Sequence, residues 1–249
     1  LTQVNSNNLQ IPDDIDVLWV MHPRSWPENS LIQLQNYIES GKRAVIMLDP
    51  YAESVPPISL SNAPNRSLYL ASDITKLFNR WGIKYEPLQV VLDSKYAWLM
   101  QLNENQFPKR NPALISLPTE AMNQRDKVTA DLDRLVFSSA GALSIGESSP
   151  LKIEPLLQSS DSSKLINVDN LRLASEDPEQ LLNNFIPTQE PFVLAARFTG
   201  SIENSSKDPK NINFIVITDT DMLSDRLWVL ENNLFGQSVF SAQASNGDF

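Results

Sequence analysis

Carboxylates follow two of the most apolar stretches of the chain. Asp49 comes directly after residues 43–48, and Asp219 and Asp221 come just after residues 213–218. If these stretches are parallel strands of one sheet, their carboxyl ends meet at the edge where ligands usually bind. Three carboxylates there could hold Mg²⁺ or Ca²⁺, because hard cations take oxygen ligands. The alternative is that each aspartate caps its own strand-to-loop turn by accepting nearby backbone N–H groups.

The rest of the composition excludes many kinds of catalytic site. The 249 residues contain no cysteine and one histidine, His22. Thiol nucleophiles, disulfides, iron–sulfur clusters and paired-histidine metal sites are therefore excluded. No phosphate-binding glycine loop and no GxSxG motif is present. We interpret His22, which precedes Pro23, as a turn histidine that hydrogen-bonds a loop, since a general base needs a nucleophile or substrate proton within reach.

The net charge of −10 also narrows the classes of partner. Nucleic-acid binding requires a basic face, and peripheral binding to anionic membranes requires a polybasic surface. This chain is acidic and its runs of charge are short and mixed, so the sequence indicates neither nucleic-acid binding nor peripheral binding to anionic membranes.

Aromatic residues indicate one candidate partner surface. Tyr96 and Trp98 belong to a short apolar segment in an otherwise irregular part of the chain. Exposed there, they would form a contact surface for a protein, a carbohydrate or a peptide. Trp19, Trp81 and Trp228 fall on the core faces of predicted strands and helices, so we expect them to be buried.

Apolar runs and turn residues predict the elements that would position these side chains. Residues 15–21 predict a strand buried on both faces. A helix follows, with apolar residues at helical spacing and Gly41 as its stop, and residues 43–48 predict a second buried strand. This strand–helix–strand unit is typical of parallel βαβ architecture.

Later segments repeat parts of this pattern. A helix ending at Gly82 precedes a predicted strand at 88–92, and further strands are expected at 192–198 and 213–218. A last helix is expected over 225–233, with Leu227, Leu230 and Leu234 facing inward. Prolines and serines break the stretch 93–165, which predicts an irregular, mainly β insertion at the periphery.

Together these patterns predict the fold class and the domain organisation. We expect residues 1–249 to form a single α/β domain with the insertion 93–165 within it. Its sheet is expected to be mostly parallel, doubly wound and flavodoxin-like, with helices on both faces.

Three blocks of sequence occur in the order found in a known family. They are Ile11–Val20 with Pro23 after it, Tyr37–Pro50, and Ile215–Leu223. In this order the chain resembles the GldG-like auxiliary components of ABC transporters, a gliding-motility-type, uncharacterised transport family. Asn246–Phe249 matches a further short piece of the family pattern, whereas Ser40 stands where the family usually has glycine.

The resemblance implies a setting for the domain. It implies a protein anchored in the inner membrane, of which this sequence is the domain facing the periplasm, with an ABC permease and a separate ATPase subunit as partners. It also implies a fold similar to class I glutamine amidotransferases and to a domain of an intraflagellar-transport subunit. Because the amidotransferase nucleophile is cysteine, which this chain lacks, that activity is excluded and no catalytic residue is carried over.

The expected function is therefore a non-catalytic binding or scaffolding domain of an ABC-type transport system, without a cofactor and without a bound metal. Two alternatives stay open. One is a metal-assisted hydrolase that uses Asp49, Asp219 and Asp221. The other is a carbohydrate- or peptide-binding module that uses Tyr96 and Trp98. No stretch approaches 18 consecutive apolar residues, so we expect any membrane anchor to lie outside these 249 residues.

Overall fold

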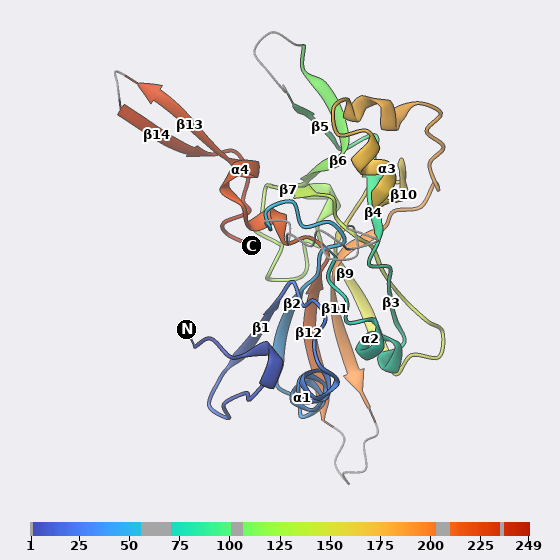
Figure 1. The fold of residues 1–249 in the computed structure, drawn as a ribbon, viewed down its shortest axis with the longest axis vertical. Coiled ribbons are helices and arrows are strands. Elements are labelled where there is room, and N and C mark those ends of the chain that lie inside the picture. The colour runs from blue at the N-terminus through green and yellow to red at the C-terminus, as the bar shows by residue number, and fades with distance from the viewer. Residues whose placement is uncertain (1, 56–70, 101–106, 203–209, 235–236) are drawn as a thin grey trace, which may run out of the picture.

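The computed structural model describes residues 2–55, 71–100, 107–202, 210–234 and 237–249 (Figure 1). The strands are β1 (Val17–Met21), β2 (Arg43–Met47), β3 (Ile83–Tyr85), β4 (Gln89–Asp93), β5 (Ala97–Met100), β6 (Lys109–Pro118), β7 (Arg134–Ser138), β8 (Leu143–Ile145), β9 (Leu151–Gln158), β10 (Ser163–Asn167), β11 (Val193–Ser201), β12 (Asn211–Ile217), β13 (Val229–Leu234) and β14 (Gln237–Ala242). The α-helices are α1 (Glu28–Glu39), α2 (Thr75–Trp81), α3 (Val168–Leu173) and α4 (Asp225–Trp228). Short 3₁₀ helices are η1 (Ser6–Asn8), η3 (Thr119–Ala121), η4 (Pro178–Leu182) and η5 (Asp221–Leu223).

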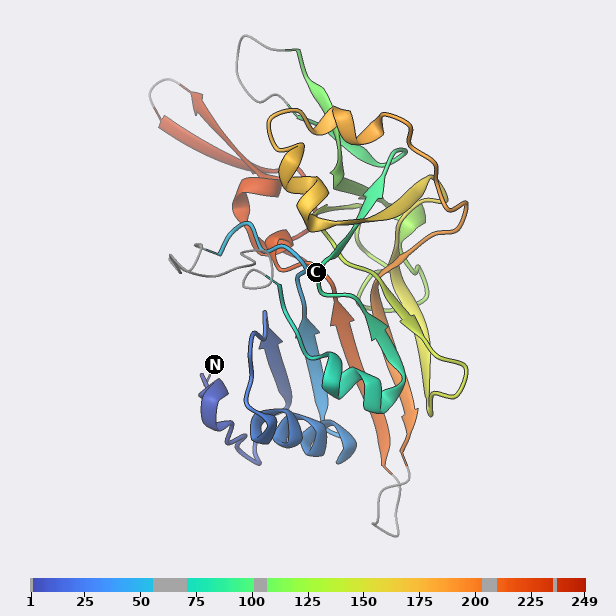
Figure 2. The same cartoon turned by 45° about the vertical axis from the view of Figure 1, so that its right-hand side comes forward.

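The main sheet has seven strands in the order β1-β2-β12-β11-β8-β3, with β9 also paired to β11 (Figure 2). β1, β2 and β12 run parallel to one another. β11 runs antiparallel to β12, to β9 and to β8, and β8 is antiparallel to β3. The sheet is therefore mixed, with its parallel part at one end.

The expected doubly wound, mostly parallel fold of flavodoxin or amidotransferase type is wrong. Strands account for 37% of the described residues and helices for 20%, and the sheets are mixed or antiparallel. The connection between β11 and β12 shows why. A parallel connection needs a crossover of about a dozen residues or more, usually with a helix. Only nine positions separate Ser201 from Asn211, too few for such a crossover, and β11 and β12 pair antiparallel.

The two faces of the main sheet are covered by different kinds of element. Helices α1 and α2 pack on one face, where Ile38 and Trp81 share a core with Phe214 of β12. The rings of Trp81 and Phe214 lie 5.2 Å apart. The opposite face packs against strands, and Phe137 of β7 shares a second core with Ile217 of β12. Among the described elements, the expectation of helices on both faces is therefore wrong for this sheet.

Helices α1 and α2 follow the predicted pattern of apolar spacing. In α1 the residues at positions 31, 34 and 38 are buried, and Glu28 lies in the first turn, where a negative charge favours the helix dipole. α2 ends at Gly82, whose φ of 70° places it in the left-handed region that glycine tolerates.

β1 differs from the strand that the apolar run predicts. Leu18 and Val20 are buried under α1, but Val17, Trp19 and Met21 on the other face are 41%, 54% and 53% exposed. The expectation that residues 15–21 are buried on both faces is therefore wrong, and so is the expected burial of Trp19. The reason is position, because β1 is the last strand of the sheet.

The stretch 93–165 contributes to more than one sheet. β5, β6 and β7 form a three-stranded antiparallel sheet. β8 and β9 join the main sheet through β11. β10 pairs antiparallel with β4, the strand predicted at residues 88–92.

The helix expected over 225–233 is shorter than its apolar spacing indicates. It ends at Trp228, which is half-buried, and the chain continues as β13, which pairs with β14. Leu230, expected to face inward, is 50% exposed. In Figure 1 this hairpin projects from the rest of the molecule. Pairing with the next strand, β14, has overridden local helical spacing here.

Candidate functional site

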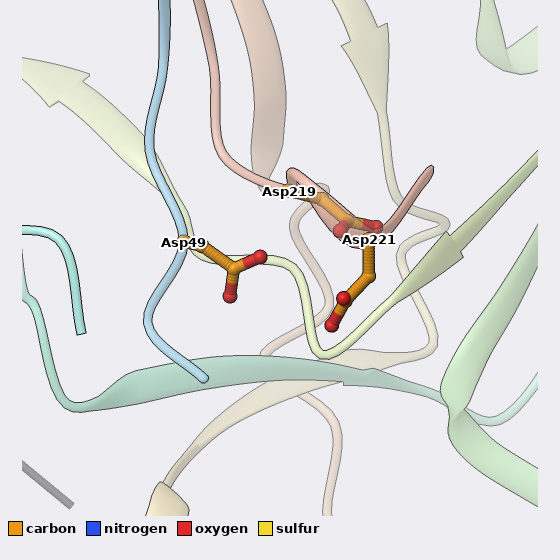
Figure 3. A group of neighbouring side chains, drawn as sticks. All are labelled: Asp49, Asp219 and Asp221. Carbon is orange, nitrogen blue, oxygen red and sulfur yellow. The ribbon is translucent and has the colours of Figure 1, made fainter. Parts of the chain in front are cut away.

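Asp49, Asp219 and Asp221 meet at the carboxyl ends of the parallel strands. β2 and β12 are parallel neighbours, so Asp49 and Asp219, each two residues beyond its strand, arrive side by side. Asp221 opens η5. A carboxylate oxygen from each residue lies within 4.8 Å of the others, and all three residues are 0% exposed (Figure 3). We call these three residues the aspartate cluster.

Asp49 is held by the loop that follows β12 and by its own turn. The backbone N–H of Tyr51 donates to its Oδ1 at 2.8 Å. The backbone N–H and the hydroxyl of Thr220 both donate to its Oδ2, at 2.9 and 2.7 Å. Both oxygens of Asp49 therefore already accept hydrogen bonds.

Asp219 joins the main sheet to the three-stranded sheet. The backbone N–H of Ser138, at the end of β7, donates to its Oδ2 at 2.6 Å. The backbone N–H of Met222 donates to its Oδ1 at 3.2 Å, which is the turn-capping arrangement.

Asp221 fixes the loop that follows Asp49. The backbone N–H groups of Glu53 and Ser54 donate to Oδ2 and Oδ1 of Asp221, both at 2.7 Å. An Nη atom of Arg226 lies 3.9 Å from Oδ2. Each of the six carboxylate oxygens of the aspartate cluster thus accepts at least one backbone N–H.

The cluster strongly disfavours full ionisation. The pKa of Asp49 is raised to about 8, mainly by burial and also by the negative charge of Asp221. The hydrogen bonds from Thr220 and Tyr51 lower this pKa and so oppose the increase. Burial also raises the pKa of Asp219 well above its usual range, and the charges of Asp49 and Asp221 add to that increase. Near neutral pH the cluster therefore favours retaining protons or acquiring a compensating cation.

Glu53 extends the acidic site, although no sequence pattern predicts it there. Its Oε1 accepts the hydroxyls of Ser138 and Ser139, both at 2.9 Å, and its Oε2 lies 3.3 Å from an Nη of Arg226. No strand end or motif marks Glu53 in the sequence. Only the position of β7, about 85 residues further along the chain, brings its partners to it.

His22 lies beside the cluster without joining it. Its Nδ1 is 2.7 Å from the hydroxyl of Ser72, which also accepts the backbone N–H of Asp49 at 3.0 Å. Burial, together with the positive charge of Arg24, lowers the pKa of His22 to about 4 against the opposing effect of Asp221. The ring is therefore neutral at neutral pH and hydrogen-bonds a loop residue, as the turn-histidine interpretation predicts.

Trp98 lies on β5 of the three-stranded sheet, Tyr96 directly precedes that strand, and neither is part of the aspartate cluster. Both side chains are half-buried. Tyr96 packs against the second core, with Nζ of Lys95 5.1 Å from its ring centre. Of the neighbouring apolar residues, Leu99 is the more open, at 62% exposed. The use of this region as a partner surface stays a prediction.

Comparison with known proteins identifies the family. The family described as an ABC-type uncharacterized transport system matches residues 1–249. The chain belongs to this family. This match confirms the prediction, made from the GldG-like resemblance, that the chain is an ABC transport auxiliary component. Membership of this family is consistent with a non-catalytic role.

Other comparisons add little about function. No curated protein matches this ABC transport auxiliary chain. Among solved structures it is similar to one titled "mmIFT52 N-terminal domain", at 12% sequence identity and a TM-score of 0.47, covering 86% of this chain and 70% of that one. Within the described residues, no helix is both long and apolar enough to cross a membrane.

Proposed function

We propose that this domain is a non-catalytic binding and scaffolding module of an ABC-type transport system. It faces the periplasm, belongs to a protein anchored in the inner membrane, and docks on the permease and the separate ATPase subunit of the same system. Membership of the ABC transport auxiliary family supports the class of system. The anchoring, the orientation and the partners are the finer parts of the proposal.

The non-catalytic assignment rests on the hydrogen bonding and burial of the three carboxylates. A nucleophile or general base needs an oxygen aimed at its substrate. In the aspartate cluster all six oxygens accept backbone N–H groups of the chain itself, and the three residues are 0% exposed. The cluster therefore acts as a structural junction between loops.

Co-purification tests the docking. The full-length protein is purified from membranes through an affinity tag on the permease, with a tagged, unrelated membrane protein as the control. We expect the full-length protein to be retained by the permease and absent from the control. A full-length protein that is found free of membranes and of the permease would contradict the proposal.

Protease accessibility tests the orientation. In intact spheroplasts, added protease reaches only segments outside the inner membrane. We expect this domain to be cleaved without lysis, whereas a cytoplasmic control protein is protected. Protection of the domain until lysis would place it on the opposite side of the membrane.

A metal-assisted hydrolase is the second candidate function, and the geometry of the cluster is the observation that favours it. Three carboxylates within 4.8 Å can converge on one hard cation, since each oxygen has a second lone pair. Such a cation would lower the pKa of a bound water and produce a nucleophile. In this alternative, millimolar Mg²⁺ or Ca²⁺ raises the melting temperature of the wild type but not of Asp219→Asn. An unchanged melting temperature in the wild type would reject it.

A further inference from the structure

The outer edge of β1 carries open backbone groups. β1 ends the main sheet and pairs with β2 alone. The N–H of His22 donates to the carbonyl of Met47, the last residue of β2, at 2.9 Å, and backbone directions alternate along a strand. The N–H and C=O groups of Val17, Trp19 and Met21 therefore point away from β2. In the described part of the chain, no backbone hydrogen bond reaches them.

The same three residues present an apolar stripe to solvent. Their side chains are 41–54% exposed and share the face of β1 that α1 does not cover. Further into the sheet, this face is covered, because Ile215 and Ile217 of β12 are buried in the second core. The covering layer thus ends before β1, which lies at the margin of the sheet in Figure 2.

β1 also lacks the features that usually protect an edge strand. Natural edges carry charged residues, proline or a bulge, which block pairing with another chain. Val17–Met21 contains none of these residue types, and its register with β2 is continuous. The strand is therefore competent to accept another strand along its whole length.

Negative charge precedes the stripe. Asp13, Asp14 and Asp16 are exposed and lie immediately before β1. Lys42 lies 3.5 Å from Asp13, whereas Asp14 and Asp16 have no ion pair among the described residues. Together with the net charge of −10, these residues favour a partner with basic residues at the corresponding end.

We propose that β1 is a docking edge that accepts an extended segment of a partner protein as an added strand. The segment carries apolar side chains at alternate positions, which cover the stripe, and Lys or Arg at the end beside Asp14 and Asp16. Main-chain hydrogen bonds hold the strand while the side chains give specificity. This inference rests on the proposed docking function, of which it names the surface and the chemistry of the partner.

A second copy of this chain is a poorer occupant. Each copy carries a charge of −10, so association must overcome mutual repulsion.

Labelled peptides test the chemistry of the edge. The basic probe is a sequence of alternating valine and threonine with two lysines at one end. It is made in two versions, with the lysines at the N-terminus or at the C-terminus. The matched acidic peptide has glutamates in place of the lysines. Binding is followed by fluorescence anisotropy. We expect one basic peptide to bind at least about tenfold more tightly than the acidic one, and to weaken as salt is raised.

Variants test the position. Trp19→Lys and Val17→Pro should each weaken the basic peptide by about tenfold. Val17→Pro removes only an outward N–H at the first position of the strand, so the ladder with β2 is kept. Phe240→Lys changes an aromatic residue on β14 that is 65% exposed, more than Trp19, and should bind like the wild type. Circular dichroism confirms that each variant is folded.

Three outcomes would overturn the inference. The first is that acidic and basic peptides bind equally well. The second is that the Trp19→Lys variant binds the basic peptide as tightly as the wild type does. The third is that light scattering shows a dimer of the wild type but a monomer of Trp19→Lys, which would assign the edge to a second copy. The co-purification experiment separates the two proposals. If the full-length Trp19→Lys protein is retained by the permease like the wild type, docking stands and the role of β1 fails. If the wild type is not retained, the docking function itself fails.

Discussion

Thr220 donates both its backbone N–H and its hydroxyl to one oxygen of Asp49, across 171 positions of sequence. The pair joins the end of β2 to the loop after β12 in a region where the carboxylate has no access to water. Two donors on one oxygen partly offset the cost of burying Asp49 among other carboxylates. This contact makes the aspartate cluster a stable junction.

Thr220→Val should therefore destabilise the protein by about 1–2 kcal/mol, because it removes a hydrogen bond to a buried acidic group. The free energy of unfolding in urea is the measurement. Thr119→Val is the matched control, since its hydroxyl donates to the carbonyl of Asp133 at 2.9 Å in an exposed position. A change of no more than about 0.5 kcal/mol is expected there. Equal losses in the two variants would contradict the role of Thr220.

The raised pKa values predict an unusual dependence of stability on pH. A carboxyl whose pKa is higher in the folded state binds more protons when folded, so its contribution is full at low pH and is lost as pH rises through the folded pKa. For Asp49 the window runs from about 4 to about 8, and Asp219 shifts in the same direction. With a chelator present, the melting temperature should fall across this range.

Asp219→Asn provides the control for the pH prediction. It removes one titrating carboxyl and its repulsion of the other two, so the fall in melting temperature between pH 5 and pH 8 should become shallower. If the wild type instead becomes more stable over this range, or if the variant has the same slope, the cluster is not the origin of the pH dependence.

Arg197 and Asp126 form a two-pronged ion pair between β11 and the loop that precedes β7. Nε and an Nη of Arg197 donate to the two carboxylate oxygens at 2.7 and 2.9 Å, and the Asp126 side chain is 8% exposed. Arg197→Met should cost roughly 1–2 kcal/mol of unfolding free energy, because it leaves a charge partly buried and unpaired.

Arg80→Met is the control for this pair, because Arg80 and Glu28 are both more than 40% exposed. A loss below about 1 kcal/mol is expected. The Arg197 pair also lowers the pKa of Asp126, so its contribution should disappear when the pH falls below the usual range of an aspartate. A cost that is the same at pH 2.5 and pH 7 would contradict this explanation.

Gly82→Ala should destabilise the protein by at least about 1 kcal/mol, because Gly82 has φ of 70° and a Cβ would lie 2.8 Å from the Cβ of Ser149. Gly146→Ala is the matched control. A Cβ there would lie 3.6 Å from its nearest neighbour, and no positive φ opposes it. Urea unfolding of both variants is the measurement, and similar stabilities would refute the prediction.

Local patterns in the sequence predicted some elements and could not predict others. Helical spacing and a terminal glycine identified α1 and α2, since both signals are local. The convergence of Asp49 and Asp219 followed from two apolar runs that are neighbours in the sheet. Ser138 and Glu53 reach the same site through pairings more than 80 positions apart, which no local pattern records.

The errors have a common physical cause. An apolar run indicates a strand but not its place in the sheet, so Trp19 was expected in the core although β1 is an edge. Likewise, Leu227 and Leu230 have helical spacing, yet pairing with Gln237–Ala242 makes a hairpin from Val229 onward. In both cases the pairing of strands, which apolar spacing does not record, decides the outcome.

The aspartate cluster gives this cysteine-free chain a function that disulfides often serve. Its hydrogen bonds close loops of 81, 168 and 171 residues, joining the first, middle and last thirds of the sequence at one point. Unlike disulfides, these cross-links form without an oxidant and respond to protons instead of thiols. The junction therefore forms identically whether the chain matures under oxidising or reducing conditions.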